Sequence, residues 1–96
     1  MNLLYFRPAN AREEEYFNFD KHILARFRRD LDRDAFYLGG QLHMKHNDMI
    51  TVDIIHRIQM SNEGRSLDVY TARKELEFIE QMLYTYHLLM LLRENC

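Results

Sequence analysis

Four basic side chains in the first third of the chain are spaced so that a helix would bring them onto one face. Steps of four, three and four residues separate His22, Arg26, Arg29 and Arg33, which we call the arginine row. An arginine guanidinium makes two charge-assisted hydrogen bonds to a phosphate, so such a row can follow a nucleic-acid backbone. The row predicts an RNA-contact surface, to which Lys45 and Arg65 are added. The alternative is a solvated face whose arginines are neutralised by Asp30, Asp32 and Asp34.

The histidines of the middle segment do not form a recognisable metal or catalytic site. His43 and His46 are three residues apart, and positions three apart on a strand point to opposite faces. No cysteine or Glu-x-x-His motif supplies the spacing that metal ligands need. His56 is expected to be a buried, hydrogen-bonded residue or a pH switch, and Asp68 a helix cap. Because a phosphate-binding glycine loop and a nucleophile elbow are also missing, we expect no metal, no cofactor and no enzymatic activity.

The composition is typical of one globular domain spanning residues 1–96. Hydrophobic residues make up 47% of the chain, enough for a packed core and too much for a disordered chain. The net charge is −2, so charge alone does not indicate a nucleic-acid binder, although the cations are mostly arginine. Cys96 is the single cysteine, and no apolar stretch is long enough for a signal peptide or a membrane span. We therefore expect a cytoplasmic protein without disulfides or membrane contact.

The elements that must position these residues begin with a predicted strand at residues 2–7, which Pro8 ends. Asn10 then has the side chain of a helix N-cap, and glutamates follow it in the first turn. Apolar residues at steps of three and four predict one helix over about 10–32, which carries the arginine row.

The middle of the chain changes to alternation of apolar and polar residues. This pattern predicts strands within 36–45 and over 50–60. Asn47-Asp48 is a plausible hairpin turn between them, and Gly39-Gly40 is a bulge or a second turn. A helix over 48–60 remains the alternative, because one helical face would also gather Thr51, Ile54, Ile55 and Ile58.

A long amphipathic helix is predicted after the turn residues at 61–66, with Ser66 or Asp68 as its cap. Its apolar residues recur at steps of three and four, at Val69, Ala72, Leu76, Ile79, Leu83, Tyr86 and Met90. After Met82 apolar residues surround the helix, which is more than one small domain can cover. The surplus predicts an interface with a second copy or another protein at Tyr86, Leu88, Leu89 and Leu92.

The segment before and into this helix resembles the family of hibernation-promoting factors and ribosome-associated translation inhibitors. The resemblance is carried by Ser61-Asn62-Glu63-Gly64 and by Asp68-Val69-Tyr70-Thr71-Ala72, followed by Glu75-Leu76 and Glu80-Gln81-Met82-Leu83. It implies a β-α-β-β-β-α domain that binds RNA of the small ribosomal subunit and blocks translation under stress. In that setting the arginine row would face ribosomal RNA.

Together these patterns predict an α+β fold of order β-α-β-β-(β)-α, in which a small antiparallel sheet packs against two helices. Two functions follow. The first is a non-catalytic, ribosome-associated translation inhibitor that binds ribosomal RNA. The second is a small dimeric adapter or inhibitor that binds protein through its C-terminal helix and has no role with nucleic acid.

Overall fold

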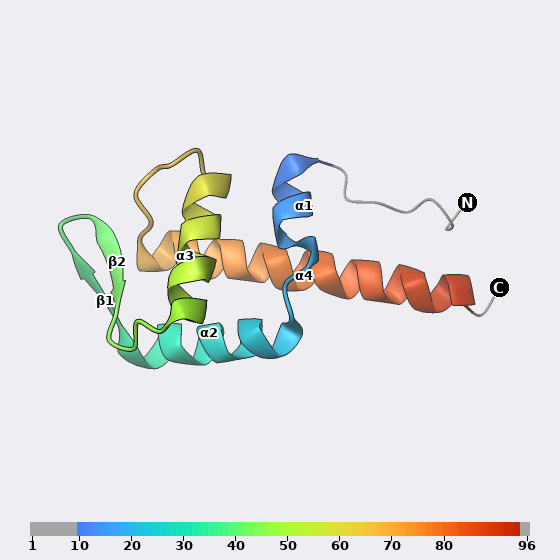
Figure 1. The fold of residues 1–96 in the computed structure, drawn as a ribbon, viewed down its shortest axis with the longest axis horizontal. Coiled ribbons are helices and arrows are strands. Elements are labelled where there is room, and N and C mark those ends of the chain that lie inside the picture. Colours follow the sequence, from blue (N-terminus) through green and yellow to red (C-terminus); the bar gives the residue numbers. More distant parts are fainter. Residues whose placement is uncertain (1–9, 95–96) are drawn as a thin grey trace.

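Four helices and one two-stranded antiparallel sheet make up the part of the chain that the computed structural model describes, residues 10–94 (Figure 1). The elements are α1 (Ala11–Phe17), α2 (Lys21–Asp34), β1 (Ala35–Leu38), β2 (Gln41–Met44), α3 (Met49–Ser61) and α4 (Val69–Glu94). The predicted α+β class is therefore confirmed, whereas the predicted order is only partly right. The strand expected at 2–7 lies outside the described residues.

The first predicted helix is two helices. Asn10 caps α1 as expected, because its side-chain oxygen accepts from the backbone N–H of Glu13 at 3.0 Å. The helix then ends at Phe17, and Asp20 caps α2 by accepting from the backbone N–H of His22 at 2.7 Å. The prediction of one helix over 10–32 is wrong at this break, because a second capping side chain starts a new helix axis.

The two strands form a hairpin closed by Gly39-Gly40. The φ angles of Gly39 and Gly40, 59° and 81°, are left-handed, as a two-residue hairpin turn requires. The interpretation of these glycines as a turn is therefore confirmed. In the register of this hairpin, Phe36 pairs with His43 and Leu38 with Gln41. Backbone groups of the alternate residues, Ala35 and Tyr37 on β1, consequently point to the outer edge of the hairpin.

The two outer edges of the hairpin differ. The edge of β2 is covered, because the backbone N–H of Leu42 donates to the carbonyl of Leu67 in the α3–α4 loop. No further strand among the described residues pairs with the edge of β1. Three consecutive side chains of β1 are exposed as well, namely Phe36, Tyr37 and Leu38.

The segment predicted as a strand over 50–60 is helix α3, so that prediction is wrong and the alternative is right. Asp48 does not form a hairpin turn with Asn47; it caps the helix, accepting from the backbone N–H of Thr51 at 2.8 Å. The buried residues Thr51, Ile54 and Ile58 follow steps of three and four, which is a helical face. The apolar residues that would share one face of the predicted strand do not share a face of the helix, since Ile50, Val52 and Met60 are exposed.

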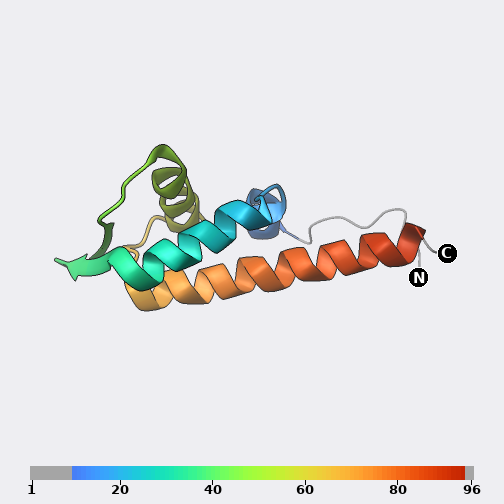
Figure 2. The ribbon, with the colours of Figure 1, turned by 90° about the horizontal axis from the view of Figure 1, so that it is seen from below.

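Helix α4 is the central element of the domain, and the other three helices pack against its first two thirds (Figures 1 and 2). Asp68 caps it as predicted, accepting from the backbone N–H of Thr71 at 2.7 Å. Its buried side chains meet the apolar faces of α1, α2 and α3 in one core, which includes Tyr16, Leu24, Phe27, Leu31, Ile54, Ile58, Leu67, Ala72, Leu76 and Ile79. The core is thus built mainly between helices, and the sheet contributes Leu42 and Met44 at its margin.

The molecule is elongated, with dimensions of 50 × 25 × 21 Å along its principal axes. Helix α4 has 26 residues and spans roughly 39 Å at 1.5 Å per residue. Its C-terminal part projects past α1 and α2, while the hairpin lies at the opposite end of the molecule (Figure 1).

Candidate protein-interaction surface

The projecting end of α4 carries large apolar side chains that are exposed. We call residues 84–92 the α4 tail; in it, Tyr84 is 65% exposed, Leu88 44%, Met90 47% and Leu92 48%. The run from Leu83 to Leu92 contains no lysine, arginine, aspartate or glutamate. An uncharged apolar surface of this kind is typical of a protein-interaction site.

The exposure of the tail follows from the direction of its side chains. At 100° per residue, Tyr84 and Leu88 lie on the side of α4 roughly opposite to Ile79 and Tyr86, which face the core. Met90 continues the core side, yet it is exposed because α4 has by then run past the body of the domain (Figure 2). The tail therefore presents apolar groups on two sides.

The predicted interface residues are only partly in this surface. Leu88 and Leu92 are exposed and Leu89 is half-buried. Tyr86 is a correction: it is buried, and its ring packs edge-on against Phe17 with centroids 5.0 Å apart. The spacing of the apolar seam placed Tyr86 on the right line of the helix, but it could not show that α1 covers that position.

A groove adjoins the tail, between the first half of α2 and the middle of α4. This α2–α4 groove has a volume of about 470 Å³. It is lined by Phe19, Lys21, Leu24, Ala25, Arg28, Glu80, Leu83, Tyr84 and His87. Arg28 and Glu80 form an ion pair across it, with Nε and Oε1 3.1 Å apart. Because Tyr84 belongs to both the groove and the tail, the two apolar surfaces are continuous.

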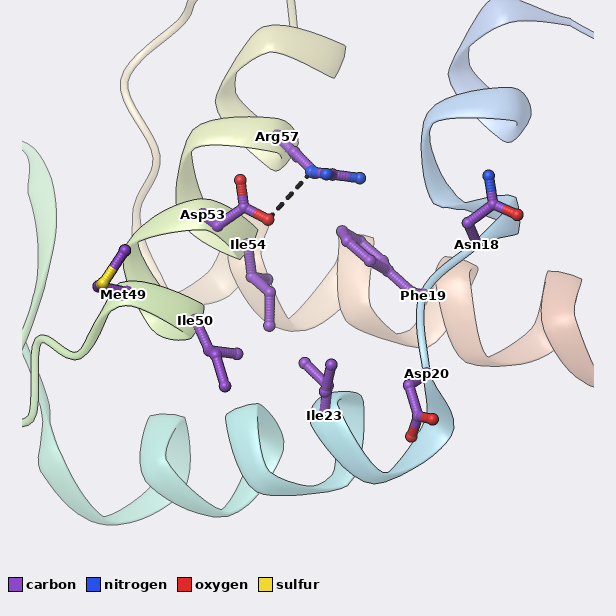
Figure 3. A pocket seen from close by; sticks show the side chains of 9 residues that line it. All are labelled: Asn18, Phe19, Asp20, Ile23, Met49, Ile50, Asp53, Ile54 and Arg57. Atoms are coloured by element: carbon purple, nitrogen blue, oxygen red, sulfur yellow. Dashed lines mark ion pairs between the residues drawn. The ribbon is translucent and has the colours of Figure 1, made fainter.

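A second hollow, the α2–α3 cleft, lies on another side of the domain and has a volume of about 350 Å³ (Figure 3). Ile23 of α2 and Ile50 and Ile54 of α3 point toward one another across it. At its rim Arg57 pairs with Asp53 at 3.1 Å, and its guanidinium lies 5.3 Å from the centre of the Phe19 ring.

The chemistry of the α2–α3 cleft is that of an apolar recess with a neutralised ion pair. Its nine lining residues include no serine, threonine, cysteine or histidine, so it offers no hydroxyl, thiol or imidazole as a nucleophile or proton-transfer group. Asp20 and Asp53 also line it, and most of the other lining residues are apolar, so an apolar side chain of a partner fits the cleft.

The arginine row is assembled on α2 as predicted, but its charges are partly neutralised. The row lies on the side of α2 away from the buried residues Leu24, Phe27 and Leu31. Arg26 pairs with Asp48 and also lies 3.7 Å from Asp30. Within the described residues, His22, Arg29 and Arg33 are exposed and have no ion pair, so the neutralised alternative holds for Arg26 only.

The two basic residues added to the row lie in different places. Lys45 is near the end of α2, since its backbone N–H donates to the carbonyl of Asp34 at 3.1 Å. Arg65 lies in the α3–α4 loop, 3.9 Å from Glu63, and is not part of the α2 face. His56, expected to be buried, is exposed on α3 because its segment is a helix.

A partly buried polar cluster joins α1 to α4, and no periodic pattern in the sequence indicates it. The guanidinium of Arg12 pairs with the Glu75 carboxylate and lies 4.1 Å from the centre of the Phe78 ring. The hydroxyl of Tyr16 donates to the other oxygen of Glu75 at 3.3 Å. Burial raises the pKa of the Tyr16 hydroxyl to about 12, and the hydrogen bond to Glu75 raises the pKa of Arg12. The cluster fixes α1 in place beside the tail.

The described residues contain neither a metal-ligand cluster nor a helix that could span a membrane. Across residues 10–94, no group of three or more histidine, cysteine, aspartate or glutamate side chains could hold a metal ion. No helix of this part of the chain is long and apolar enough to cross a membrane. Comparison of the chain with protein-family models, curated proteins and solved structures gives no match.

Proposed function

We propose that the protein is a non-catalytic protein-binding module that associates with a second copy of itself through the α4 tail. The observation that carries the proposal is the exposed, uncharged apolar surface of Tyr84, Leu88, Met90 and Leu92 on a helix that projects from the domain. Such a dimer fits the role of a small adapter or inhibitor that acts by contact.

The free energy gained by burying the apolar surface of the tail supports association. Burying several hundred Å² of apolar surface contributes on the order of 10 kcal/mol at about 25 cal/mol per Å², before the costs of association. A second copy fits the tail because the tail offers no charge that would select a charged partner. A two-fold axis then brings the same uncharged patch of both copies together.

The first test replaces Leu88 by glutamate. A buried carboxylate without a partner opposes association strongly, so Leu88→Glu should convert a dimer to a monomer in size-exclusion chromatography with light scattering. Val52→Glu is the matched control, because Val52 is also an exposed apolar helix residue, 50% exposed, but on α3. An unchanged mass for Leu88→Glu, or a monomeric parent protein, would contradict the proposal.

A second candidate function is RNA binding, as the resemblance to ribosome-associated translation inhibitors implies. Its support is the exposed, unpaired Arg29 and Arg33 on one face of α2 within the described residues, with Lys45 near the end of that helix. Helix α3 replaces a strand that the family's order requires, so this candidate stands second to protein binding.

The RNA candidate predicts co-sedimentation with small ribosomal subunits, which weakens steeply as salt is raised because phosphate contacts release counterions. The double replacement Arg29→Ala and Arg33→Ala should then remove most of the binding. Arg57→Ala with Arg73→Ala is the matched control, because it removes the same charge from arginines that pair with Asp53 and Asp32. A protein that stays at the top of the gradient at low salt excludes this function.

A further inference from the structure

The two ends of the α2–α4 groove differ in charge. At one end Arg28 and Glu80 neutralise each other, with Nε and Oε1 3.1 Å apart. Lys21 lies two helical turns before Arg28 on α2, and His87 lies two turns after Glu80 on α4. Because α2 and α4 run in opposite directions (Figure 2), Lys21 and His87 meet at the other end of the groove.

The end of the groove at Lys21 and His87 is a positive site without a partner. Among the residues that the structure describes, neither side chain has an ion pair or a hydrogen bond. The adjacent Asp20 accepts from the backbone N–H of His22 and lines the α2–α3 cleft instead. Lys21 is also the first residue of α2, where the helix dipole favours an anion. An imidazole carries at least one N–H, so His87 can donate to that anion in either protonation state.

The wall between the two ends of the groove is apolar. It is formed by Phe19, Leu24, Ala25, Leu83 and Tyr84. Lys21, Ala25 and Arg28 share one side of α2, so the small alanine leaves room between two longer side chains. The groove volume of about 470 Å³ lies within the range of about 300–1,000 Å³ that is usual for small-molecule sites.

We propose that the α2–α4 groove binds a small amphipathic carboxylate, in its simplest form an unbranched medium-chain fatty acid. The alkyl chain lies along the apolar wall, and the carboxylate accepts hydrogen bonds from the Lys21 ammonium and the His87 imidazole. This site goes beyond the proposed function and does not depend on it, because Lys21 and Ala25 lie on α2, outside the α4 tail.

The distribution of charge selects this class of ligand. Lys21 and Arg28 against Glu80 leave one positive charge in the groove, and that charge is at the end without an ion pair. An amine would be repelled there, and an alcohol would leave the lysine without a counter-charge. The groove follows two turns of each helix, roughly 10 Å, which suits a chain of medium length.

Titration of octanoate into the full-length protein tests the site by isothermal calorimetry, at concentrations below those at which octanoate forms micelles. Octanol and octylamine are the matched ligands, because they carry the same alkyl chain with no charge and with the opposite charge. Octanoate should bind saturably at a single site, octanol should bind more weakly, and octylamine should bind least.

Two substitutions locate the ligand. Lys21→Met keeps the length of the side chain without its charge, so it should weaken octanoate about fivefold and leave octanol unchanged. Lys45→Met is its control, because Lys45 is an exposed lysine outside the groove. Ala25→Phe fills the groove and should abolish binding of both ligands. Its control is Ala11→Phe, at an exposed alanine of α1, and circular dichroism checks that each variant keeps its helices.

Four results overturn the inference. Octanoate that shows no saturable binding means that the groove is no ligand site. Equal affinity for octanoate and octanol, or octanoate binding that Lys21→Met leaves unchanged, removes the carboxylate from the lysine. Binding that persists in Ala25→Phe places the ligand elsewhere. Failure of the proposed function is distinct from all four, because the protein would then be a monomer in light scattering and would still bind octanoate.

Discussion

Phe27→Ala should lower the free energy of unfolding by about 3–5 kcal/mol, the range for removing a large aromatic side chain from a core. Phe27 is 1% exposed and packs in the core that α2 forms with α4. Deleting its ring removes apolar contacts and leaves a cavity that rigid helices on both sides cannot close. Urea unfolding followed by circular dichroism measures the change, read from the midpoint at constant slope.

Phe36→Ala is the matched control for this prediction. It deletes the same ring from a side chain that is 44% exposed on β1, where the ring stacks on His43 with centroids 5.3 Å apart. Its cost should be well below that of Phe27→Ala. Equal costs at the two positions would contradict the placement of Phe27 at the centre of the core.

Stability should also fall between about pH 10 and pH 12, by about 2–3 kcal/mol, because of the single hydroxyl of Tyr16. In the folded protein burial raises the pKa of this group to about 12, whereas an unfolded tyrosine titrates near pH 10. Below pH 10 both states hold the proton, so nothing is lost. Between the two pKa values only the unfolded state releases it, and unfolding becomes progressively more favourable.

Urea unfolding of the protein and of Tyr16→Phe, from pH 9 to pH 12 at constant ionic strength, measures this loss. The difference between the two curves isolates Tyr16 from the lysines and arginines that titrate nearby. Tyr84→Phe is the control, because Tyr84 is exposed. Removing its hydroxyl should leave the loss of stability between pH 10 and pH 12 as large as in the parent protein. If Tyr16→Phe loses as much stability as the parent over this range, the buried hydroxyl is not responsible.

Local signals in the sequence predicted the starts of α1 and α4, but not those of α2 and α3. Asn10 and Asp68 cap helices as expected, because a capping side chain acts on backbone only two or three residues away. The same signal stands at Asp20 and Asp48, but there the apolar spacing predicts one helix in place of two and a strand in place of α3. At 50–60 the β-branched residues favoured a strand, but Ile54 and Ile58 satisfy both periods, and only packing decides between them.

The candidate surface was predictable in kind and less so in detail. An apolar surplus at the end of α4 is visible in the sequence, because no charge interrupts it from Leu83 to Leu92. Which of its residues are covered depends on where α1 lies, and α1 is fixed by Arg12 and Glu75, 63 positions apart. Contacts at such separation leave no periodic trace, so the burial of Tyr86 and the α2–α4 groove could only come from the structure.

A dimer joined through its α4 tails carries the outer edge of β1 at both of its far ends, since hairpin and tail lie at opposite ends of each copy (Figure 1). Strand β1, Ala35–Leu38, has no charge and no proline to discourage pairing with another strand; only its shortness does. Contacts made there between dimers would repeat from one dimer to the next, because each end offers a new edge. Whether such dimers stay separate or grow into fibres at high concentration therefore depends on four residues of one strand.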